Sequence, residues 1–149
     1  QGAGTIPEER SEETLIAFEE YYDLNQTDAQ MKNDRLSRIR SADIEELHFE
    51  PLLVESFIQI VKNFQSFSDQ VEVIMLPRNT KWITNTPEGT ARLADAIKQI
   101  EQATGITIRD HQDLDIIDPT MFSDTTHLAR YRGDVPYTNY LIEQYANDL

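Results

Sequence analysis

The chain contains no cysteine among its 149 residues, so disulfide bonds, thiolate nucleophiles and cysteine-ligated metal centres are excluded. Basic residues are scarce, since 13 Lys and Arg stand against 27 Asp and Glu and leave a net charge of −14. Charge of this sign repels phosphate backbones and anionic lipids, so we expect no nucleic-acid partner. No apolar run approaches the roughly 20 residues that span a bilayer, and no signal peptide is visible.

What remains is the composition of one globular domain, with 39% apolar and 27% charged residues. The negative charge is concentrated in both ends of the chain, whereas residues 51–100 contain five basic and five acidic side chains and should form the core. We expect a loose lead-in or tag remnant over residues 1–10 and a single α/β domain over 11–149. Within that domain, residues 11–45 form a helical extension and 46–149 the α/β portion.

Apolar periodicity and capping residues predict five helices and two strands. The predicted helices cover 11–24, 27–40, 51–67, 87–104 and a last segment that begins at Asp134 and Pro136. The predicted strands cover 71–76 and 106–109. Pro51 and Pro87 suit first helical positions, and Gly105 ends the fourth helix. The third helix shows a broad stripe that we expect to be buried, made of Leu53, Val54, Phe57, Ile58, Val61 and Phe64.

The strand, helix and strand between residues 71 and 109 form a βαβ unit, which predicts a parallel pair with a right-handed crossover. Two strands are few for such a sheet, so we expect its earlier strands to lie outside this chain. Loops 77–82 and 110–127 leave the carboxyl ends of the two strands, where α/β proteins place their ligand sites. The two loops should therefore lie side by side.

The second loop contains an Asp-x-x-His pair, Asp124 and His127. This spacing brings a carboxylate to one imidazole nitrogen and leaves the other nitrogen to accept a proton from a nucleophile. The pattern alone is weak, because Asp is abundant in this chain. Asp124 capping a turn beside an ordinary histidine is the alternative interpretation.

Residues 71–149 resemble the C-terminal part of SGNH/GDSL-type hydrolases, nearest the branch of DltD-like proteins and bacterial polysaccharide O-acyltransferases. The matching features are the strand that ends at Pro77, the helix 87–104, the strand 106–109 and the stretch from Met121 to Leu128. The resemblance implies a three-layer, flavodoxin-like parallel sheet, here incomplete and preceded by extra N-terminal helices. It also implies that His127 is the general base of a Ser-His-Asp triad and Asp124 its partner, and it points to the cell envelope.

The sequence departs from this family in two places. Gly133 follows the histidine by six residues rather than the usual five, and the Gly-Asp-Ser nucleophile block is absent. We assign no serine of this chain as the nucleophile. The hypothesis is therefore the C-terminal segment of an ester hydrolase or O-acyltransferase that acts on a small acyl ester or acylated glycan. The serine would come from a missing N-terminal part of the same protein.

Other polar residues near the strand ends allow competing interpretations. Arg78, Asn79 and Trp82 would grip an anionic or sugar substrate, or they form an ordinary surface turn. The aspartates between residues 110 and 124 fit a solvated loop better than a calcium site, so we expect no metal and no cofactor. The alternative function, of a different class, is a non-catalytic acidic α/β interaction module whose N-terminal helices dock a basic partner.

Overall fold

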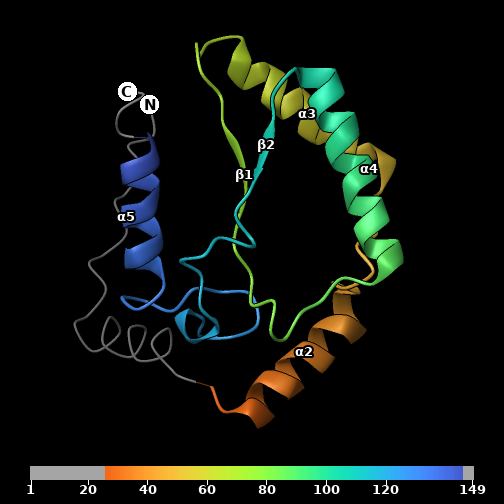
Figure 1. The fold of residues 1–149 in the computed structure, drawn as a ribbon. Helices are drawn as coiled ribbons and strands as arrows, with labels where there is room; N and C mark the ends of the chain where they lie inside the picture. Colours follow the sequence, from red (N-terminus) through yellow and green to blue (C-terminus); the bar gives the residue numbers. More distant parts are fainter. Residues whose placement is uncertain (1–25, 146–149) are drawn as a thin grey trace, which may run out of the picture.

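The computed structural model describes residues 26–145, and these residues form a mixed α/β fold (Figure 1). Its elements in chain order are α2 (Asp28–Ala42), α3 (Pro51–Gln65), β1 (Val73–Met75), α4 (Pro87–Thr104), β2 (Ile108–Asp110), the 3-10 turn η1 (Pro119–Met121) and α5 (Asp134–Tyr145). The α/β class predicted from the sequence is confirmed. The predicted lead-in and the helix 11–24 lie outside the described residues.

The predicted ends of α4 are confirmed by their hydrogen bonds, whereas α2 ends two residues later and α3 two residues earlier than predicted. The Thr86 side chain accepts from the amide of Gly89 at 3.0 Å, Pro87 opens α4, and Gly105 ends it in the left-handed region with φ of 74°. At the start of α2, Thr27 and Gln30 form a reciprocal capping box. These local contacts fix the helix bounds independently of the rest of the fold.

The two strands pair in parallel, with Val73 opposite Ile108 and Met75 opposite Asp110. The predicted βαβ unit is therefore confirmed, with α4 as its crossover helix. β2 begins at Ile108 rather than at residue 106, and the amide of Ile108 donates at 2.8 Å to the Glu101 side chain instead of to β1. Among residues 26–145, β1 has a strand neighbour on one side only.

Helices α3 and α4 pack on each other through Val54, Ala96 and Ile100. The predicted buried stripe of α3 is wrong for half of its members. Leu53 is 64% exposed and Phe64 51% exposed, and Phe57 is also exposed. The physical reason is that α4 covers one side of the stripe, while no described element covers the other.

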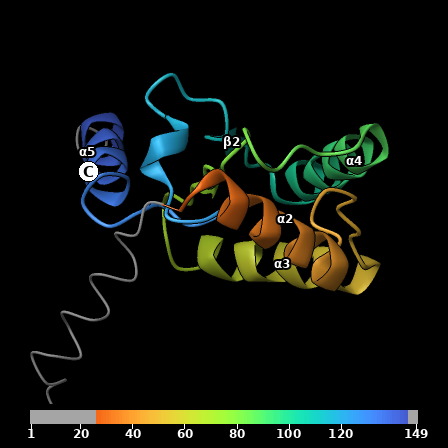
Figure 2. The same ribbon diagram turned by 90° about the horizontal axis from the view of Figure 1, so that it is seen from below.

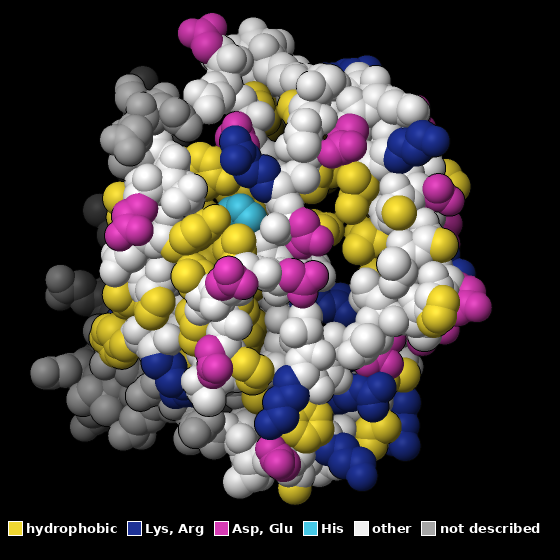
Figure 3. All heavy atoms as spheres, viewed as in Figure 1, with side chains coloured by type: hydrophobic (Ala, Val, Ile, Leu, Met, Phe, Trp, Pro, Cys, Tyr) yellow, Lys and Arg dark blue, Asp and Glu magenta, His cyan; other side chains and the backbone are white. Residues whose placement is uncertain are grey.

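An apolar groove of about 290 Å³ separates this helix pair from the strands, and Leu53, Phe57 and Ile74 line it. Figure 3 shows hydrophobic side chains in the hollow between the strands and α4.

Further buried side chains come from the segments that follow the strands and from α5: Ile83, Phe122, Ala129 and Tyr137 are all nearly inaccessible. Gly133 makes this packing possible, because a Cβ there would lie 2.1 Å from the carbonyl oxygen of Met121. Helix α5 lies on the opposite side of the strands from α3 and α4 (Figures 1 and 2). No helix within residues 26–145 is long and apolar enough to cross a bilayer.

Candidate active site

The two loops that leave the strands touch, as the sequence predicts. The amide of Asn79 donates to the carbonyl oxygen of Thr125 at 3.2 Å. The second loop then folds back on itself as a small hairpin, in which Phe122 bridges Leu128 and the amide of Ser123 donates to the carbonyl oxygen of His127 at 3.0 Å. This hairpin places Asp124 and His127 at its tip, beside the loop that follows β1.

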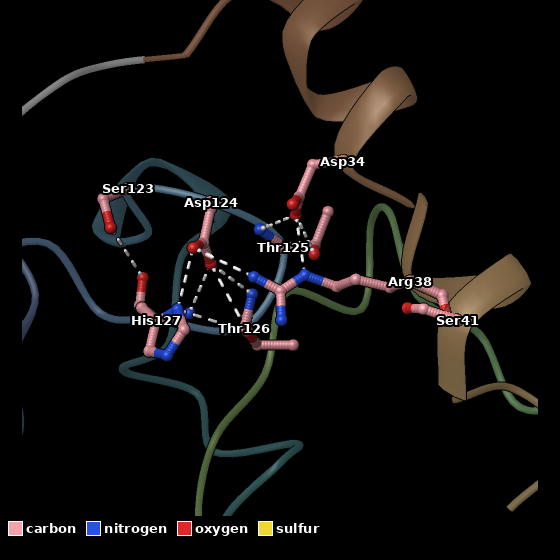
Figure 4. A network of polar contacts seen from close by, with 8 residues as sticks. All are labelled: Asp34, Arg38, Ser41, Ser123, Asp124, Thr125, Thr126 and His127. Atoms are coloured by element: carbon pink, nitrogen blue, oxygen red, sulfur yellow. Dashed lines mark hydrogen bonds and ion pairs between the residues drawn. The ribbon is translucent and has the colours of Figure 1, made fainter. Parts of the chain in front are cut away.

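Asp124 contacts the imidazole directly (Figure 4). Its Oδ2 atom lies 2.7 Å from Nδ1 of His127. Its Oδ1 atom accepts the backbone amides of Thr126 at 2.8 Å and of His127 at 2.7 Å. Asp124 therefore does both things that the sequence allowed: its Oδ1 atom caps the turn, and its Oδ2 atom contacts the imidazole.

The imidazole is more accessible from solvent than its acid. The His127 side chain is 60% exposed and the Asp124 side chain 18% exposed. With Nδ1 engaged by Asp124, no described residue hydrogen-bonds Nε2, which leaves that nitrogen to exchange a proton with another molecule. Position and exposure thus fit a general base.

The pKa of Asp124 lies below its ordinary value. Burial alone would raise this pKa, but the hydrogen bonds from the Thr126 amide and from the His127 side chain and amide outweigh burial and favour the charged form. The carboxylate is therefore ionised at neutral pH, which is the state that orients an imidazole and stabilises its protonated form.

Helix α2 contributes a side chain that sequence reasoning did not place here. Arg38 donates from Nη2 to Oδ2 of Asp124 at 3.1 Å and from Nε to Oδ2 of Asp34 at 2.9 Å (Figure 4). Asp34 in turn accepts the amide of Thr125 at 3.2 Å and also bonds to its hydroxyl. The sequence predicted the Asp34–Arg38 pair as part of a solvated helix face. The one feature of the sequence that could have indicated this contact is the thin apolar face of that helix, which suggests that the helix packs on another surface.

No described serine is placed as a nucleophile. Ser123 is nearest in sequence, but its hydroxyl points to the backbone oxygen of His127 at 3.3 Å rather than to the ring (Figure 4). The hydroxyls of Ser41, Ser56, Ser66 and Ser68 also bond to backbone oxygens nearby in sequence. No serine hydroxyl of the described residues is shown bonded to the His127 ring, so the serine of the proposed triad is sought outside them.

The three residues predicted to bind substrate in the loop after β1 have different surroundings. Arg78 is half-buried and donates to Oδ1 of Asn85 at 2.6 Å, and burial, partly offset by the charge of Glu45, lowers the pKa of Arg78. Asn79 is 1% exposed and donates to the carbonyl oxygen of Pro119 at 3.3 Å. Trp82 lies under the Lys81 ammonium at 5.6 Å and does not line the cavity that Arg78 and Asn79 share.

The remaining polar residues of the second loop do not converge on a metal site. Within residues 26–145, no three His, Asp or Glu side chains gather closely enough to hold an ion. His111, which the sequence placed in the acidic loop, is buried, and its Nδ1 lies 3.0 Å from the Tyr137 hydroxyl. Burial, together with the charge of Arg109, lowers the pKa of His111, so this ring stays neutral within the packing of α5.

In comparisons with known proteins, no protein-family model matches the sequence, and neither the curated proteins nor the solved structures give a match.

Proposed function

We propose that this chain supplies the base and the orienting acid of a serine-dependent ester hydrolase or O-acyltransferase of the SGNH type. The observation that supports the proposal is the 2.7 Å contact between Asp124 and Nδ1 of His127, combined with an exposed imidazole in a hairpin that contacts the loop after β1. Ligand sites of open α/β sheets form at the carboxyl ends of the strands, where this loop begins.

The chemistry follows from the placement of the two ring nitrogens. Nε2 of His127 takes the proton from a serine hydroxyl as that oxygen attacks an ester carbonyl, while Asp124 stays ionised and stabilises the imidazolium. The imidazolium then returns the proton to the leaving alkoxide. A water molecule or a sugar hydroxyl next attacks the acyl-serine, and His127 accepts its proton in the same way. The bond between the acyl group and the serine oxygen then breaks, and the imidazolium returns the proton to that oxygen. Attack by water completes hydrolysis, and attack by a sugar hydroxyl completes acyl transfer.

The proposal places the serine and the remaining strands of a three-layer sheet outside the described residues. It is supported by the open edge of β1 and by the uncovered apolar side of α3, since both fit a sheet that continues past β1. The acylated substrate, a small ester or an acylated glycan, is part of the same proposal.

Labelling with a fluorophosphonate probe, which reacts with base-activated serines, tests this function in the longest natural polypeptide that contains the chain. We expect labelling and p-nitrophenyl acetate hydrolysis in the wild type and their loss in His127→Ala. His48→Ala is the matched control, because His48 is equally exposed and lies near an acid, at 3.8 Å from Asp43. Equal labelling of the wild type and His127→Ala removes His127 from the mechanism.

A further inference from the structure

The polar cavity that Arg78 and Asn79 share lies between the loops that follow the two strands, and Phe122 of the His127 hairpin borders it. Its volume is about 270 Å³. The loop after β1 contributes Arg78 and Asn79 to its wall, the loop after β2 contributes Gln112, Asp113 and Asp115, and Phe122 of the hairpin also lines it. Two loops that are far apart in the sequence thus build one concave site.

Arg78 is unusual among the arginines of this acidic chain. Four others each bond to a carboxylate at 3.1 Å or less: Arg35, Arg38, Arg92 and Arg109. Arg78 is half-buried, yet no described carboxylate lies within ion-pair distance, and the Asn85 amide oxygen accepts from one of its five N–H groups. The charge of Glu45 offsets the burial of Arg78 only in part, so a bound anion would recover more of the cost of desolvating this guanidinium.

The rest of the wall is rich in acceptors. Oδ1 of Asn79 is buried without a hydrogen-bond partner among the described residues. Asp113 and Asp115 are exposed at the rim, where their charges disfavour ligands with more than one negative charge. A ligand that fits this cavity combines a single negative charge for Arg78 with a hydroxyl donor for the acceptors.

We propose that the cavity between the two loops binds a hydroxycarboxylate, with its carboxylate on Arg78 and its hydroxyl directed to the acceptor-rich wall. This site goes beyond the acyl-transfer chemistry of His127, and binding at Arg78 requires neither that chemistry nor the external serine. Figure 3 shows acidic side chains on the same face of the molecule as the strands, which fits a site that excludes polyanions.

The test is an NMR titration of the chain with three sodium salts at constant ionic strength: glycolate, acetate and phosphate. Acetate differs from glycolate by one hydroxyl, and phosphate is mostly a dianion above pH 7.5. We expect saturable shifts of the Arg78 and Gln112 side-chain signals, with glycolate tightest, acetate weaker and phosphate weakest. Arg78→Gln should weaken glycolate binding roughly tenfold or more, because charge-assisted hydrogen bonds are lost.

Two variants control for folding and for bulk charge. Arg40→Gln removes an exposed arginine of α2 and should leave glycolate binding unchanged. Asp113→Asn keeps Arg78 and should tighten binding, since it removes a negative charge from the rim. The proposal is overturned if glycolate shifts do not saturate, if they persist in Arg78→Gln, or if phosphate binds as tightly as glycolate. Equal binding of acetate and glycolate overturns the role of the hydroxyl.

Discussion

Replacing Arg38 by glutamine tests the link between α2 and the candidate site. The guanidinium bonds to Asp124 at 3.1 Å and to Asp34 at 2.9 Å, so the variant leaves two carboxylates that face each other without a cation between them. Glutamine keeps most of the length and the helix propensity of arginine. The variant therefore isolates the charge and its two hydrogen bonds.

The expected loss of stability follows from the burial of the bridge. Arg38 is 28% exposed, and the side chains of its two partners are 25% and 18% exposed. Fully exposed ion pairs contribute up to about 1 kcal/mol, whereas breaking a buried pair costs about 3–5 kcal/mol. Between these limits we expect a loss of about 2 kcal/mol, which lowers Tm by about 4–8 °C for a chain of this size.

Thermal unfolding followed by circular dichroism measures this loss, with Lys32→Gln as the control. Lys32 is an exposed residue of the same helix without a described ion pair, and its replacement should change the free energy of unfolding by less than about 0.5 kcal/mol. Equal melting temperatures for Arg38→Gln and Lys32→Gln would show that the bridge contributes nothing.

The same Arg38→Gln sample reports on the Asp124–His127 contact. The downfield proton on Nδ1 of His127 should remain visible by NMR, because Oδ1 of Asp124 is still held by two backbone amides. Asp124→Asn should remove this resonance. Its loss in Arg38→Gln would instead show that the bridge, and not the hairpin, positions the acid.

Three further predictions follow from other parts of the fold. The folded chain lowers the pKa of Asp124, so the ionised carboxylate stabilises the fold above the ordinary carboxyl pKa of about 3.9. This stabilisation is lost as the pH falls through the lower pKa of the folded state. Asp124→Asn should therefore make the free energy of unfolding less dependent on pH on the acid side, as measured by urea unfolding between pH 5 and about 2. Val61→Ala should lower the free energy of unfolding by about 2 kcal/mol in the same assay, because the Val61 side chain is buried at 2% exposure. Leu53 is 64% exposed, so Leu53→Ala should lower it by less than about 1 kcal/mol. Gly133→Ala should destabilise the chain by more than about 2 kcal/mol, because the added Cβ would lie 2.1 Å from a backbone oxygen. Gly105→Ala should cost about 1 kcal/mol, because the added Cβ has open space but the residue keeps a positive φ. A larger loss of melting temperature for Gly105→Ala than for Gly133→Ala would contradict this account.

The features that the sequence predicted correctly are those set by neighbouring residues. Thr86, Pro87 and Gly105 define the ends of α4 through contacts within one or two turns. The contact between Asp124 and His127 is local in the same sense. Parallel pairing of the strands followed from the length of the crossover and the short links at its ends.

The features that the sequence missed depend on long-range packing. Periodicity marked α3 as amphipathic, but it did not show that Val54 packs on α4 while Leu53 stays 64% exposed. Arg38 and Asp124 are separated by 86 positions, and no local pattern connects them. The near-complete burial of Asn79 also depends on a distant contact, since its amide bonds to the carbonyl oxygen of Thr125 in the second loop.

The hairpin from Phe122 to Leu128 has a consequence for folding. Its acid and its imidazole are three residues apart, so closing the chain between them costs little entropy and can occur before distant segments meet. The Arg38 contact, by contrast, must await docking of a helix from the other end of the polypeptide. We therefore expect the hydrogen-bonded pair of Asp124 and His127 to form early in folding, and to depend less than its surroundings on the order in which the remaining elements assemble.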